Sequence, residues 1–191
     1  MMAAAEPKLD VPTRVLHIGL VVFGVWAWWI GEGAHDYHKP DHSGYMLHMY
    51  VGLAFSAFLA GRLLWGFIGP RELRFSAWLP YTRERLAYVK ADIRTLARFR
   101  MPEPVTHRGL NAMVQALGLL LFTWQGASGT LMSIMIVPGQ KSEGWLDVVQ
   151  DIHHEWGGIW IPTYLALHVG AAVLHAFTGR QIWNKMVFLG R

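Results

Sequence analysis

Four long apolar segments are the feature that most constrains how this chain folds. They cover approximately residues 15–32, 46–68, 109–137 and 154–178 and use most of the 191 residues. A helix needs about 20 mostly apolar residues to cross the hydrocarbon core of a membrane, and each segment comes near that length. The sequence therefore predicts an all-α integral membrane protein, a four-helix transmembrane bundle that forms one domain over residues 1–191.

The composition agrees with a membrane protein and restricts its chemistry. Hydrophobic residues make up 53% of the chain and charged residues 16%, which is too apolar for an ordinary soluble domain. The chain has no cysteine, so disulfides, zinc–thiolate sites, iron–sulfur clusters and covalently attached haem are excluded. A bound metal ion therefore has to be held by histidine, carboxylate or methionine.

The distribution of Lys and Arg predicts the orientation in the membrane, because positively charged flanks stay in the cytoplasm. Of the 17 basic residues, only Lys39 and Lys141 lie in the connections 31–45 and 138–155. Both termini are therefore expected to be cytoplasmic, and the two sparsely basic connections are expected to face the outside. This topology explains the basic pI, so a nucleic-acid partner is not expected.

Residues 81–100, between the second and third apolar segments, form a cytoplasmic segment with helical periodicity. Its apolar residues recur at helical spacing with Arg and Lys between them, at Leu86, Val89, Ile93 and Leu96. This pattern is typical of an amphipathic helix at the membrane surface. A solvated basic helix is an equally good interpretation of the same pattern.

Four histidines lie at matched depths within or at the ends of the apolar segments. His17 is near the cytoplasmic end of the first segment, and His48 opens the second on the outer side. In the last segment, His154 lies near the outer end and His168 follows fourteen residues later. On a straight helix His168 is about 21 Å deeper and on nearly the same face. We therefore predict two cross-helix pairs, His48 with His154 and His17 with His168.

The two histidine pairs predict haem binding. Ionisable side chains inside a bilayer are costly and mark functional sites, and two facing imidazoles in an apolar bundle are what a bis-histidine b-type haem needs. Small residues beside the ligands leave room for a flat macrocycle, at Gly24, Gly31, Gly52, Gly158 and Ala172. Such residues also occur wherever membrane helices approach closely, so they support the histidines without replacing them. Two haem sites at different depths predict a path for electrons across the membrane.

Other polar residues admit more than one role. Arg62 lies on the same face as His48 at the cytoplasmic depth, where it either binds a haem propionate or reaches the lipid headgroups. His175 rivals His168 as the inner ligand, but its depth assigns it instead to a propionate, a quinone or an interface. His153 is one residue out of phase and is expected to point to headgroups or to a neighbouring loop.

Two further groups of histidines are not expected to hold haem. His35, His38 and His42 lie in the first outer connection, where a solvated or partner-docking loop is favoured over a Zn²⁺ or Cu²⁺ site. His107 precedes the third apolar segment. That segment contains no histidine and is expected to pack rather than to ligate.

Three stretches of the chain resemble the bacterial cytochrome b561 family, which includes the b-type cytochrome subunits of membrane-bound nickel–iron hydrogenases. They are "PTRVLHIGLVVFGVWAWWIGEG", "HMYVGLAFSAFLAGRLLWGFIGPRELRF" and "HHEWGG…LALHVGAAVLH". The resemblance implies a multi-pass protein of the bacterial cytoplasmic (inner) membrane with two haem b groups, whose ligands are His17, His48, His154 and His168. The chain departs from the family at Ile18, where Trp is usual, and at "THRGLN", where the family has Gly-His-Asn-Pro.

The same resemblance implies a role in electron transport. It implies transfer between a quinone pool and a periplasmic redox partner, such as a dehydrogenase or hydrogenase subunit of a respiratory complex. The alternative is a standalone quinol oxidoreductase. In either case membrane lipid and quinone are partners, and quinone is a candidate second cofactor. A metal-ion transporter is disfavoured because the carboxylates stay at the edges of the segments, and a structural anchor is disfavoured because the histidine depths match.

Overall fold

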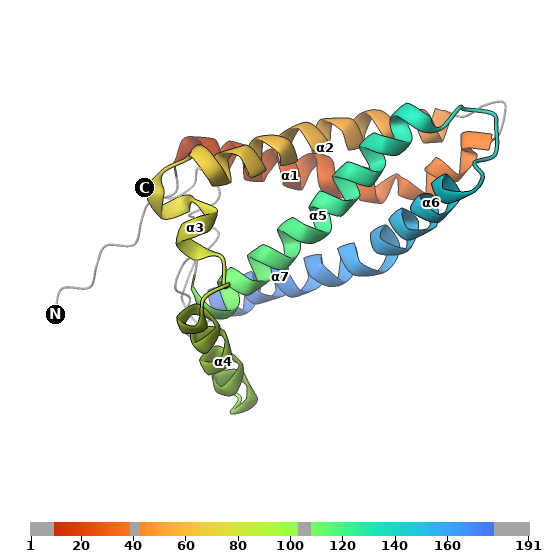
Figure 1. Cartoon of the computed structure of the whole chain (residues 1–191). Coiled ribbons are helices and arrows are strands. Elements are labelled where there is room, and N and C mark those ends of the chain that lie inside the picture. Colours follow the sequence, from red (N-terminus) through yellow and green to blue (C-terminus); the bar gives the residue numbers. More distant parts are fainter. Residues whose placement is uncertain (1–9, 39–42, 103–107, 178–191) are drawn as a thin grey trace.

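The computed structural model describes residues 10–38, 43–102 and 108–177, which are helical and contain no strand. The long helices are α1 (Val11–Trp29), α2 (Ser43–Ile68) and α5 (Gly109–Met135), together with α6 (Trp145–Glu155) and α7 (Ile161–Phe177), which the π-helical turn η3 (Trp156–Trp160) joins. The short elements are η1 (Gly31–His38), η2 (Arg71–Leu73), α3 (Phe75–Trp78) and α4 (Arg83–Ala97). Figure 1 shows the long helices side by side in one elongated bundle, which confirms the all-α class.

Three helical stretches among the described residues are long and apolar enough to cross a membrane. They are Val11–Trp29, Ser43–Ile68 and Trp145–Phe177, and they overlap three of the four predicted segments. The remaining segment is the 27-residue helix α5, whose interior carries the polar side chains of Gln115 and Gln125. Large apolar side chains are exposed along the helices that can span the bilayer, which is how a helix surface that faces lipid is built. The chain is therefore a helical membrane protein.

Close packing joins α1 to α2. Phe58 of α2 covers Gly19 of α1 so closely that a Cβ at Gly19 would overlap the Phe58 ring, as small residues at membrane helix contacts allow. At the start of α1, Asp10 Oδ1 accepts the Thr13 N–H (3.1 Å) as an N-cap, and Asp10 Oδ2 accepts the Trp65 Nε1–H of α2 (3.0 Å). The start of α1 therefore lies beside the end of α2, and the two helices are antiparallel.

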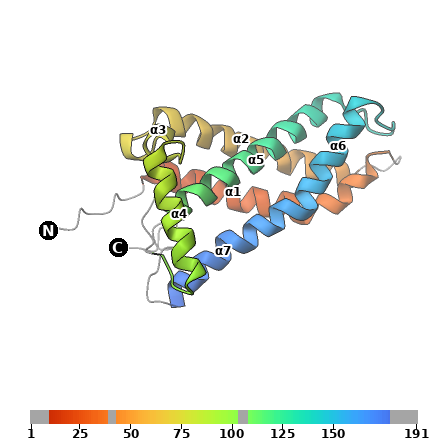
Figure 2. The ribbon, with the colours of Figure 1, turned by 60° about the horizontal axis from the view of Figure 1, so that its bottom comes forward.

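Helix α5 contacts α2, α6 and α7. Ser56 Oγ of α2 lies 3.3 Å from the Gly126 carbonyl oxygen of α5. Towards the far end of the bundle, Tyr45, Met132 and Ile136 form a buried cluster against which α6 packs. These contacts hold α5 between the first helix pair and the last helix (Figure 2).

Helix α4 lies across one end of the bundle (Figure 1). It begins at the N-cap Thr82, whose hydroxyl accepts the Arg85 N–H (3.3 Å). Asp92 Oδ2 accepts the backbone N–H of Leu110 (2.8 Å), and Val89 is buried, so α4 is fastened to the first turn of α5. The predicted amphipathic segment 81–100 is thus a helix, and it packs on the end of the bundle from which α5 starts.

The last long helix is irregular just before Pro162. Proline has no N–H and cannot bond to the carbonyl of the preceding turn, which favours a kink here. The structure places a π-turn at this point, in which the Ile161 N–H bonds to the Trp156 carbonyl. A π-turn holds one residue more than an α-turn, so it changes the rotational phase between α6 and α7 by about 100°.

Candidate functional site

Two pairs of histidine rings face each other between the first two helices and the last one. His17 of α1 lies 6.4 Å from His168 of α7, measured between ring centroids, and the two ring planes are inclined by 59°. His48 of α2 lies 6.3 Å from His153 of α6, with an interplanar angle of 85°. The first pair lies towards the α4 end of the bundle and the second towards the opposite end, so the structure contains two similar sites at different depths.

The separation within each pair fits two ligands on opposite sides of one metal ion. A histidine nitrogen binds a metal ion at about 2 Å and lies about 1 Å from the centre of its ring, so two such rings have centres about 6 Å apart. Both observed separations are close to this value. Two such imidazoles would hold the iron of a haem b.

The pair His48–His153 is called the outer pair below, and its rings are held by hydrogen bonds through Nδ1. His48 Nδ1 lies 3.0 Å from the Ala27 carbonyl of α1, and His153 Nδ1 lies 2.7 Å from the Ser128 hydroxyl of α5. A carbonyl only accepts, so His48 carries its proton on Nδ1 and keeps the Nε2 lone pair free. A histidine that binds a metal ion typically donates its other ring N–H in this way.

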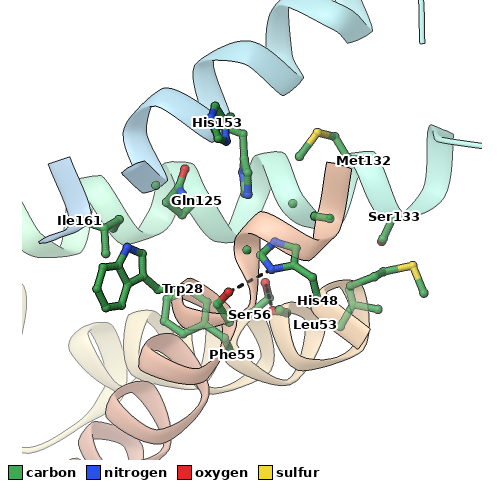
Figure 3. A pocket seen from close by; sticks show the side chains of 18 of the residues that line it. Trp28, His48, Leu53, Phe55, Ser56, Gln125, Met132, Ser133, His153 and Ile161 are labelled. Atoms are coloured by element: carbon green, nitrogen blue, oxygen red, sulfur yellow. Dashed lines mark hydrogen bonds between the residues drawn. The ribbon is translucent and has the colours of Figure 1, made fainter. Parts of the chain in front are cut away.

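A pocket that is partly open to solvent adjoins the pair His48–His153 (Figure 3). Its walls contain His48 and His153, and the predicted residue Gly52 is also part of them. A Cβ added at Gly52 or at Gly158 would meet no atom within 4 Å. The pocket walls therefore leave open space beside the ring pair, as a flat macrocycle requires.

His153 occupies the position opposite His48 that the spacing predicts for His154. The expectation that His153 points to headgroups or to a neighbouring loop is therefore wrong. His154 is exposed and also contributes to the pocket wall. The π-turn explains the difference: it adds one residue between α6 and α7, so the fifteen-residue step from His153 to His168, rather than the fourteen-residue step from His154, brings both rings to the same side.

The pair His17–His168, called the inner pair below, has a positive charge beside it. Arg62 of α2 lies near His17, and its guanidinium lies 5.6 Å from the centroid of the Phe75 ring. His175, the other candidate for the inner site, is partly buried two turns beyond His168 on α7. The structure thus brings His17, His168 and Arg62 together.

A series of aromatic contacts connects the pocket to the inner pair. Phe55, in the pocket wall, lies 5.7 Å from Phe122, and Phe122 lies 5.4 Å from Tyr164. Tyr164 in turn stacks on His168, with 5.5 Å between ring centroids and an interplanar angle of 14°. These rings come from α2, α5 and α7, so periodicity along any one helix does not reveal that they meet.

The remaining histidines of the sequence analysis lie where the structure gives no side-chain position. His35 and His38 belong to η1, but their side chains are outside the described part of the chain, as are residues His42 and His107. The expectations for these four residues stay predictions.

Comparison with known families gives a match over almost the whole chain. The family of prokaryotic cytochrome b561 matches residues 8–189, almost the whole chain. No curated protein and no solved structure matches the chain significantly. Membership implies b-type haem binding and electron transfer across a membrane. The chain belongs to the prokaryotic cytochrome b561 family.

Proposed function

We propose that this protein is a dihaem cytochrome b that carries electrons across the bacterial cytoplasmic membrane between the quinone pool and a periplasmic redox partner. The observation that carries the proposal is the pair of facing histidines at each of two depths, with ring centroids 6.4 Å and 6.3 Å apart. One such pair fits one iron. Two pairs along one bundle provide two redox sites between its ends.

Each site uses groups of this chain for a defined task. His17 and His168 hold the inner haem, and His48 holds the outer haem together with a histidine of the adjacent pair His153–His154. A bound haem b supplies the redox chemistry, because its iron takes up and releases one electron. The apolar helices exclude water from the path between the sites, and the Ala27 carbonyl fixes the ring of His48.

We assign the orientation from the basic residues. Fifteen of the 17 Lys and Arg residues lie in the N-terminal region, in residues 62–108 and in the C-terminal region, and positively charged flanks stay cytoplasmic. The α4 end of the bundle is then cytoplasmic, both termini lie on that side, and α5 is the fourth membrane-spanning helix. This topology places the His48 site near the periplasm.

The partner is a periplasmic dehydrogenase or hydrogenase subunit of a respiratory complex, and a standalone quinol oxidoreductase is the alternative. Acidic side chains are exposed around α6, at Glu143, Asp151 and Glu155. In the proposed orientation they lie on the periplasmic side, near the outer haem, where a docking protein can exchange electrons with it. Recovery of a periplasmic subunit with the cytochrome in mild detergent supports the first role, and quinol oxidation by the isolated chain supports the second.

Electron transfer through proteoliposomes tests the proposed function. Vesicles contain purified protein and trapped ferricyanide, and dithionite is added outside with valinomycin and K⁺ to balance the charge that moves. We expect the trapped ferricyanide to be reduced, one electron for each ferricyanide ion, much faster than in protein-free vesicles. Reduction at the protein-free rate by haem-loaded protein contradicts a transmembrane path. The His17→Ala variant is the matched control, because it removes one inner ligand and is expected to slow the transfer.

A further inference from the structure

The outer site offers two neighbouring histidines, and the spacing of a straight helix selects the wrong one of them. Resting on the haem function proposed above, we propose that His153 is the axial ligand opposite His48, and that Ser128 of α5 is the residue that positions it. His154 then has no bond to the iron. Three independent observations carry this assignment.

The first observation is the hydrogen bonding of the Ser128 hydroxyl. Ser128 Oγ lies 2.6 Å from the Trp124 carbonyl of its own helix, and a carbonyl only accepts, so the single hydroxyl proton points there. The oxygen is then an acceptor towards His153 Nδ1, 2.7 Å away. His153 therefore carries its proton on Nδ1 and keeps Nε2 unprotonated, which is the form that binds a metal ion.

The second observation is the packing that orients the His153 ring. Ser128 is only 4% exposed, so its hydroxyl has a fixed position on α5. The next residue is Gly129, and a Cβ at this position would come within 3.3 Å of His153 Cε1. The ring is thus held against the backbone of α5 and at 6.3 Å from His48, whereas His154 is exposed.

The third observation is the π-turn Trp156–Trp160. It adds a residue between the outer and the inner ligand of the last helix, so His153 and His168 face His48 and His17 respectively. A π-turn inside a helix often occurs at a functional site, and here it selects which of two adjacent histidines enters the bundle. The two outer ligands also acquire the same arrangement, since each donates from Nδ1 to an oxygen of a neighbouring helix.

Separate replacement of the two histidines tests the ligand. We expect the full-length His153→Ala protein to contain about half the haem per chain of the unchanged protein, and the matched His154→Ala protein to keep the full amount. Reconstitution of His153→Gly with haem and free imidazole is expected to restore the low-spin spectrum, because imidazole fills the space of the missing ring. Loss of the outer haem from His154→Ala but not from His153→Ala overturns the assignment, and so does equal loss without rescue by imidazole.

Ser128 has its own test, which separates positioning from folding. We expect Ser128→Ala to weaken binding of the outer haem by about 10- to 100-fold, as loss of a hydrogen-bonding partner of a ligand does. In Ser128→Ala, the midpoint potential of the outer haem should rise and its electron paramagnetic resonance g-values should shift. Ser128→Thr, which keeps the hydroxyl, should restore both. A change in thermal stability alone, with unchanged potential and g-values, contradicts the positioning role. If the protein without any substitution binds no haem, the proposed function itself is contradicted.

Discussion

His17 and His168 face each other at 6.4 Å although they lie in the first and the last helix of the bundle. No direct bond joins the two rings at this separation. Their positions depend on helix packing, in which α1 contacts α2, α2 contacts α5, and α5 contacts α7. Two imidazoles at this separation fit two ligands of one iron.

The inner ligands are testable by replacing them one at a time. His17→Ala and His168→Ala are each expected to lose the inner haem and keep the outer one, because a single imidazole holds haem more weakly than two. Haem content per chain and the reduced-minus-oxidised spectrum measure the loss. His175→Ala is the matched control and should keep both haems. Loss of the inner haem from His175→Ala but not from His168→Ala contradicts the ligand choice.

Gly52→Leu is expected to exclude the outer haem without unfolding the protein. Its Cβ has no neighbour within 4 Å, so the larger side chain fits the apoprotein but occupies the pocket. The haem content per chain should fall by the amount that the outer site binds, and the circular dichroism spectrum should not change. Gly19→Ala is the contrasting variant, because its Cβ overlaps Phe58. Gly19→Ala should lower the free energy of unfolding by about 1–3 kcal/mol, because the added methyl group overpacks the contact. If Gly52→Leu keeps all of the outer haem, the macrocycle does not lie beside Gly52.

Arg62→Gln is expected to lower the midpoint potential of the inner haem. The Arg62 guanidinium lies near His17, and a nearby positive charge favours the reduced state, in which the iron carries one positive charge less. Arg62→Lys keeps the charge and should keep most of the potential. Potentiometric titration of the two variants measures the difference. Equal potentials in the unchanged protein and Arg62→Gln argue that Arg62 reaches the lipid headgroups instead.

Asp92→Ala is expected to loosen α4 from the bundle. Asp92 Oδ2 accepts the Leu110 N–H at 2.8 Å, which otherwise lacks a partner in the first turn of α5, and loss of such a cap costs about 1 kcal/mol. The melting temperature in detergent should fall, and Asp92→Asn, which keeps an acceptor oxygen, should lose less. Haem content should stay unchanged, because α4 lies outside both sites. Loss of haem in Asp92→Ala contradicts this separation of α4 from the sites.

Hydropathy and histidine spacing predict the helical class, and the structure places three of the apolar segments in helices that can cross a membrane. The helix α5 is harder to assign because it carries polar residues such as Gln115 and Gln125. Gln125, for example, lies in the wall of the pocket. Hydropathy averages over all faces of a helix, so it does not distinguish a polar residue inside a bundle from one in water.

The outer ligand shows where spacing rules fail. A count of fourteen residues assumes one α-helix from His154 to His168, and the π-turn breaks this assumption by one residue. Gly157, Gly158 and Pro162 mark the irregularity in the sequence, but they do not determine whether the helix bends or gains a residue. The oxygen that binds His153 comes from Ser128 of another helix, and only the packed structure brings the two together.

The haem content of the purified full-length protein tests the central claim most directly. A pyridine haemochrome assay with protein quantification gives the number and type of haems per chain, and the reduced-minus-oxidised spectrum shows whether the iron is low-spin. The two histidine pairs predict two low-spin b-type haems per chain. One haem per chain in fully loaded protein contradicts the two-site arrangement, and no haem contradicts the electron-transfer function altogether.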